Sequence, residues 1–82
     1  MDQIEFQDLL AECETATETY FREVEKTSTL LGKCTRRPLT FEERFALLRQ
    51  EIQEGDAYLL YIDAKRFLHS AALLGYDALA TN

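Results

Sequence analysis

The feature that most constrains the fold is an unbroken heptad repeat in the first third of the chain. Apolar or small residues recur there in alternating steps of four and three, at Phe6, Leu10, Cys13, Thr17, Tyr20, Val24, Thr27 and Leu31. A second set flanks this series and widens it: Leu9, Ala16, Phe21 and Leu30. Such spacing is typical of one face of a helix that packs against other helices. It predicts a single helix over residues 2–31, about 45 Å long at 1.5 Å per residue.

Local signals predict where this first helix begins and ends. Acids crowd its first turns and Lys26 lies near its far end, which suits the helix dipole. Gly32 occupies the position where a left-handed C-cap is common. Pro38 then makes a helix through residues 32–40 unfavourable, so we expect a loop there.

The remainder of the chain reads as two shorter helices. Thr40 and Glu43 match a capping box, which predicts a helix over residues 41–54. Gly55 and Asp56 predict a turn at residues 55–56, and the apolar stretch after it predicts a helix over residues 57–75, ending at Gly75. The apolar stripe of the second helix is Phe41, Phe45, Leu48 and Ile52, and that of the third is Leu60, Ala64, Phe67, Ala71 and Leu74.

An alternative joins these two helices into one that is kinked at Gly55. The chain would then be an antiparallel hairpin of two long helices. We favour the three-helix interpretation because the apolar stripe jumps eight residues, from Ile52 to Leu60, with the charged Asp56 between them.

The predicted fold is therefore all-α, a single domain over residues 1–82. A long N-terminal helix packs on two shorter helices, as a three-helix bundle or an antiparallel helical hairpin, and dimerises into a larger helical bundle. A chain of this length buries little surface, and the two short helices would leave part of the first helix uncovered. We expect a homodimer, with these candidate interface residues: Phe6, Leu10, Cys13, Tyr20, Val24, Tyr58, Ile62 and Tyr76.

Charge is distributed unevenly along the chain. Residues 1–25 carry a net charge of −7, residues 26–49 carry +4 and residues 50–82 carry −3. The basic loop contains the candidate anion-binding or partner-binding residues Lys33, Arg36 and Arg37. Antiparallel association of two chains would place this basic end beside the acidic start of the first helix.

No cluster of residues forms a catalytic, cofactor or metal signature. His69 is the single histidine and has no carboxylate at the helical spacing that metal sites use. Cys13 and Cys34 are too far apart along the predicted helix to form a disulfide. Cys13 is expected to be a small core residue, whereas Cys34 lies among basic residues that would favour its thiolate.

We therefore expect a non-enzymatic helical module for protein–protein interaction, which self-associates and binds another protein. The alternative is a helical bundle that binds a small ligand or anion through the basic loop 33–37 or the Tyr58/His69/Tyr76 face. A third possibility is an acidic regulator of a nucleic-acid-binding partner. The sequence has no apolar segment long enough to span a membrane, and its net charge of −6 disfavours direct nucleic-acid binding. We expect a cytoplasmic location, without cofactors.

Overall fold

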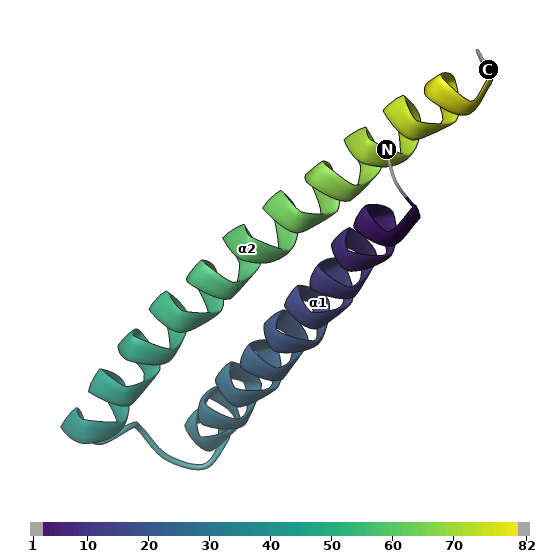
Figure 1. The fold of residues 1–82 in the computed structure, drawn as a ribbon. Helices are drawn as coiled ribbons and strands as arrows, with labels where there is room; N and C mark the ends of the chain where they lie inside the picture. The colour runs from purple at the N-terminus through teal and green to yellow at the C-terminus, as the bar shows by residue number, and fades with distance from the viewer. Residues whose placement is uncertain (1–2, 81–82) are drawn as a thin grey trace.

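The protein is an antiparallel hairpin of two long helices in a computed structural model (Figure 1). The structure describes the backbone of residues 3–80 and the side chains of residues 3–75. Helix α1 spans Gln3–Gly32, a short 3-10 helix η1 spans Lys33–Thr35, and helix α2 spans Phe41–Ala80. The predicted all-α class is confirmed for the described residues. No helix among them is long and apolar enough to cross a membrane.

The predicted turn at residues 55–56 is wrong, because α2 is one continuous helix through Gly55. The alternative of two long helices is the one that the structure adopts. A glycine inside a helix costs only about 1 kcal/mol, and helical packing on either side offsets it. The end predicted at Gly75 is wrong for the same reason, since α2 continues to Ala80.

The face of α2 that packs on α1 forms a heptad series that runs without interruption across Gly55. Its members, which we call the α2 seam, are all buried or half-buried: Glu43, Leu47, Gln50, Glu54, Ala57, Tyr61, Ala64, Leu68, Ala71 and Gly75. They face a matching α1 seam, also buried or half-buried: Phe6, Leu9, Cys13, Ala16, Tyr20, Glu23, Thr27 and Leu30. Because α2 is long, it covers α1 along its length, which corrects the expectation that part of α1 stays open (Figure 1).

A polar contact joins the two seams in the half of the hairpin nearer the loop. Gln50 is only 8% exposed and donates from Nε2 to both the backbone oxygen and the carboxylate of Glu23, at 3.1 and 2.7 Å. Thr27, also buried, donates to the same backbone oxygen at 3.1 Å. Hydrogen bonds from Gln50 and then Lys26 hold the pKa of the Glu23 carboxyl below its usual range. Buried polar groups are thus satisfied here.

Aromatic rings make the second cross-helix contact. The Tyr20 ring stacks on that of Tyr61, with centroids 5.4 Å apart, and lies at the same distance from Tyr58 in a tilted arrangement. Lys65 Nζ lies over the Tyr61 ring, 5.8 Å from its centroid. These contacts fix α1 against the middle of α2.

The loop end of α1 differs from the predicted left-handed cap. Gly32 has φ −58° and ψ −27°, which is right-handed helix, and the chain passes directly into η1. The Thr35 hydroxyl donates to the Gly32 carbonyl at 2.8 Å and supplies the capping interaction instead. A glycine is therefore not required at this position.

This geometry predicts that Gly32→Ala stabilises the protein. A Cβ at residue 32 would meet no atom within 4 Å, and the helical backbone suits alanine. Alanine lowers the entropy of the unfolded chain, so we expect a gain of about 0.5 kcal/mol. Thermal unfolding should show a midpoint higher by about 2–4 °C. A lower midpoint would show that residue 32 needs the left-handed conformation after all.

The hairpin is far from compact. Its radius of gyration is 18.5 Å and its extents are 63 × 16 × 15 Å, whereas a compact chain of this length has a radius of about 12 Å. Its accessible surface is 6537 Å², compared with about 5,000 Å² for a compact monomer of the same mass. No large side chain among the described residues is fully buried. A single hairpin thus leaves much apolar surface in water.

Candidate functional site

The main exposed apolar surface lies on the side of α2 opposite α1. We call it the outer face, and it comprises Phe41, Phe45, Leu48, Ile52, Gly55, Leu59, Ile62, Arg66, His69 and Leu73. Each member precedes a seam residue by two positions, which is a rotation of about 200° around the helix. The outer face therefore repeats with the same heptad spacing as the seam and points away from it.

Large apolar side chains on this face are open to solvent. Six of them have exposed fractions between 56% and 76%: Phe41, Phe45, Leu48, Ile52, Leu59 and Leu73. Phe41 and Phe45 contact each other, with ring centroids 5.7 Å apart. The residues predicted as the inward stripe of the second helix thus lie outward. Isolated exposed apolar residues are ordinary, but a row of this length makes the outer face the candidate surface for association.

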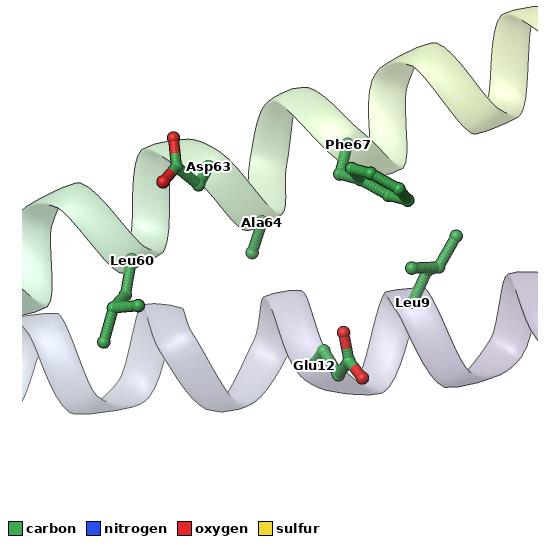
Figure 2. Close-up of a pocket in the computed structure, with 6 residues that line it drawn as sticks. All are labelled: Leu9, Glu12, Leu60, Asp63, Ala64 and Phe67. Atoms are coloured by element: carbon green, nitrogen blue, oxygen red, sulfur yellow. The ribbon is translucent and has the colours of Figure 1, made fainter.

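An open groove lies between the helices near their free ends (Figure 2). It has a volume of about 320 Å³ and is lined by Leu9, Glu12, Leu60, Asp63, Ala64 and Phe67. Four of these side chains are apolar, and the two carboxylates, Glu12 and Asp63, come from different helices. The groove is not enclosed, so it offers a contact surface for a side chain or segment and no water-excluded chamber for chemistry.

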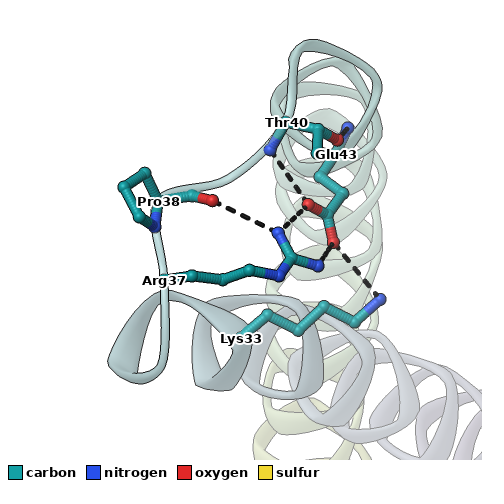
Figure 3. Close-up of polar contacts among 5 residues, drawn as sticks. All are labelled: Lys33, Arg37, Pro38, Thr40 and Glu43. Atoms are coloured by element: carbon teal, nitrogen blue, oxygen red, sulfur yellow. Dashed lines mark hydrogen bonds and ion pairs between the residues drawn. The ribbon is translucent and has the colours of Figure 1, made fainter.

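The basic loop is held by an acid of the same chain (Figure 3). Arg37 donates from Nη1 and Nη2 to the two carboxylate oxygens of Glu43, at 2.7 and 3.0 Å. Lys33 Nζ lies 3.9 Å from the same carboxylate. The predicted capping box is confirmed, because Thr40 and Glu43 exchange hydrogen bonds of 2.9 and 3.2 Å. Of the three basic candidates, Arg36 alone has no side-chain hydrogen bond or ion pair within the described residues.

The contacts of Glu43 predict a pH dependence of stability. The hydrogen bond from Arg37, then that from the Thr40 backbone, lowers the pKa of Glu43 from 4.5 to about 2. A depressed carboxyl pKa stabilises the folded state above pH 4.5 and loses that effect as the pH falls towards 2. The melting temperature of Glu43→Gln should therefore lie below that of the native protein at pH 7, and the two should converge near pH 2. A constant difference across this range would contradict the assignment, and Glu42→Gln is the matched control.

The candidate interface residues of α1 turn out to face α2 within the chain. Phe6, Cys13, Tyr20 and Val24 are half-buried there, and Leu10 lies at the edge of the seam, 40% exposed.

The other three candidates belong to α2. Tyr58 contacts Tyr20 and stays partly exposed, and Ile62 is half-buried. Tyr76 lies outside the residues whose side chains the structure describes. The proposed ligand face of Tyr58, His69 and Tyr76 is thus divided between an aromatic contact at Tyr58 and an exposed histidine.

Side chains that could react or bind a metal lie apart from one another. Cys13 is half-buried and Cys34 is exposed, and both thiols are free. Within the described part of the chain, no three potential metal ligands come together. The structure assembles no nucleophile, base and oxyanion donor at one place in the region that it describes.

Two features of the site were not found by sequence reasoning. The α2 seam was overlooked because seven of its ten residues are Ala, Gly, Glu or Gln, and the search for apolar stripes favoured the larger residues of the outer face. The pairing of Gln50 with Glu23 was overlooked because its partners are 27 residues apart. The unbroken heptad spacing of the seam is the signal that could have revealed both.

Comparison with known proteins gives no relative from which a function could be inferred: no family model, no curated protein and no solved structure matches this chain.

Proposed function

We propose that the protein is a non-enzymatic helical interaction module that self-associates through the outer face of α2 and, in that assembled form, binds another protein. The observation that supports this proposal is the row of exposed, mostly apolar side chains from Phe41 to Leu73, interrupted by Arg66 and His69, on the side of α2 opposite α1. Such a stripe costs solvation free energy in the isolated hairpin, and a partner that covers it removes the cost.

The surface excess gives the size of the required contact. The hairpin exposes about 1,500 Å² more than a compact monomer of its mass. If each of two copies buries that amount, the interface totals about 3,000 Å², which is within the range of permanent homodimers. Because the outer face points away from α1, two hairpins paired through it would set their four helices side by side in the order α1, α2, α2, α1.

Binding of another protein is supported by the groove beside Leu9 and Phe67. Its apolar lining and the Glu12 carboxylate suit a segment that presents apolar and basic side chains. The rival function, anion binding by the basic loop, has less support because Lys33 and Arg37 already contact Glu43.

The solution mass of the purified protein tests the proposed function. Light scattering at tens of micromolar should give about 19 kDa, twice the 9.5 kDa of one chain. Its melting temperature should rise with protein concentration, because unfolding then includes dissociation. A 9.5 kDa particle whose melting temperature does not depend on concentration would contradict self-association.

A further inference from the structure

The apolar and charged residues of the outer face of α2 are arranged about a midpoint near residue 57, and this arrangement indicates which molecule binds there. We infer that a second copy of this chain lies antiparallel along the outer face of α2, with the two-fold axis close to Ala57. This inference rests on the proposed function and deepens it by naming the partner, its direction and its register. It follows from the apolar stripe, from the charges beside it and from the charge difference between the two ends of the hairpin.

The extent of the stripe places the axis. The outer face runs from Phe41 to Leu73, so its midpoint is residue 57. An antiparallel copy that covers the full stripe must therefore cross this point, and residues whose numbers sum to 114 then face each other. Ile52 faces Ile62 of the second copy, and Phe41 faces Leu73 of the second copy.

Glycine at position 55 suits this register. Gly55 is exposed, and a Cβ built there would meet nothing within 4 Å in the single hairpin. It faces Leu59 of the second copy, close to the axis, where the two helices come nearest. A large residue opposite a small one allows the helix backbones to approach and fills the space between them.

Two pairs of charged residues beside the stripe indicate nearly the same position for the two-fold axis. Glu51 and Lys65 lie on one side of the outer face and Arg49 and Asp63 lie on the other, all exposed. The midpoint of the first pair is residue 58 and that of the second is residue 56. A two-fold antiparallel contact brings each side against the same side of the second copy, so both pairs meet between copies as opposite charges, twice each.

Parallel packing has the opposite consequence. It would bring each side of the outer face against the opposite side of the second copy, so Glu51 would approach Asp56 and Arg44 would approach Arg49 as like charges. The antiparallel register leaves a like-charge contact at Asp56, which lies near the axis and faces its own copy. The four attractive contacts outnumber it, so charge favours the antiparallel arrangement.

The ends of the hairpin support the same direction. The segment 26–49, around the loop, carries a net charge of +4, whereas residues 1–25, which lead to the open end, carry −7. Antiparallel copies place each basic loop end beside the acidic open end of the other. The contact is isologous and closes at two copies, so it predicts a dimer and no fibre.

An exchange of charges tests the register in the intact protein. Glu51→Lys and Lys65→Glu each create two repulsive contacts per dimer, and each should raise the dimer dissociation constant roughly tenfold at low salt. The double variant Glu51→Lys/Lys65→Glu should restore native affinity, as should a mixture of the two single variants. Residues 51 and 65 are about 21 Å apart along one helix, so rescue requires contact between copies. Glu14→Lys, on exposed α1 surface and away from the paired charges, is the matched control and should change the dissociation constant much less than either single variant.

The outcomes separate this inference from the proposed function. The native chain could dimerise while the single variants dimerise equally well, or while the double variant does not regain native affinity. Either result contradicts the register but not self-association. A native chain that stays monomeric at 100 μM or above overturns both, and the outer face then belongs to a different protein.

Discussion

Replacing Ile52 with glutamate is expected to convert the protein into a folded monomer. Ile52 is 65% exposed in the single hairpin, so the substitution removes little packing within the chain. In the inferred dimer it lies next to the two-fold axis and faces Ile62 of the second copy. Each dimer would then bury two unpaired carboxylates, which is costly in an apolar interface.

The expected size of this effect is large. The dissociation constant should rise at least about 100-fold, corresponding to about 2.7 kcal/mol. Helical content should not fall, because glutamate is a better helix former than isoleucine. Analytical ultracentrifugation measures the mass, and circular dichroism measures the helix content.

A matched control separates the interface from general surface effects. Ile4 is 66% exposed and lies on α1, away from the outer face, so Ile4→Glu makes the same chemical change at the same exposure. It should leave the dimer intact. If both variants dissociate, or if neither does, the outer face of α2 is not the site of self-association.

The second large effect is expected at the buried contact between the helices. Gln50→Glu places a carboxylate where the Gln50 amide now donates to the Glu23 carboxylate at 2.7 Å. Two negative charges would then meet at a position that is 8% exposed, where Lys26, 3.1 Å from the Glu23 carboxylate, supplies a single positive charge. We expect the free energy of unfolding to fall by about 2–3 kcal/mol at pH 7.

Two further variants make this result specific. The exchange Glu23→Gln/Gln50→Glu keeps one carboxylate and one amide, and should recover most of the loss. Gln50→Leu removes the donor without adding charge, and Glu23 keeps its hydrogen bonds from Lys26 and Thr27, so the loss should be smaller, about 1 kcal/mol. Chemical denaturation of the three variants at pH 7 and pH 4 measures these differences. The Gln50→Glu defect should shrink at pH 4, where one carboxyl of the pair binds a proton. An equal defect at both pH values would contradict the charge explanation.

Local rules predicted much of this fold correctly. The helix over residues 3–32 follows from its heptad repeat, and the start of α2 follows from the capping box of Thr40 and Glu43, which the structure confirms. The basic loop was also located correctly. The sequence alone did not reveal that Arg37 pairs with an acid of the same chain. The carboxylate of Glu43, which caps α2, also accepts a hydrogen bond from the Arg37 guanidinium.

Long-range packing was harder to predict. The break at Gly55 was expected because the large apolar residues seemed to define the inward face, and their stripe is interrupted at Asp56. In the structure, α1 packs instead on smaller and polar residues such as Gln50, Ala57 and Ala71, whose spacing is unbroken. Large apolar side chains indicate which helix faces are expected to be buried. They do not indicate whether the same chain or another chain buries them.

The same ambiguity explains the candidate interface. Residues of α1 such as Phe6 and Tyr20 were assigned to a partner because two short helices would cover only part of the first helix. A continuous α2 covers them within the chain and leaves its own outer face open. The expected dimer remains a proposal, but its surface moves from α1 to α2.

The distance between the two copies of Cys34 tests the account most directly. Cys34 is exposed at the loop end, beside Lys33, which contacts Glu43, so it lies about level with residue 43 of α2. In a Cys13→Ala background, a spin label on Cys34 reports this distance by pulsed electron paramagnetic resonance. The antiparallel register places the two loop ends 28 residues apart along α2, or about 42 Å. We predict a label separation of about 40 Å or somewhat more. A separation below about 25 Å would show parallel copies, and the absence of any dipolar coupling would show that the protein does not pair.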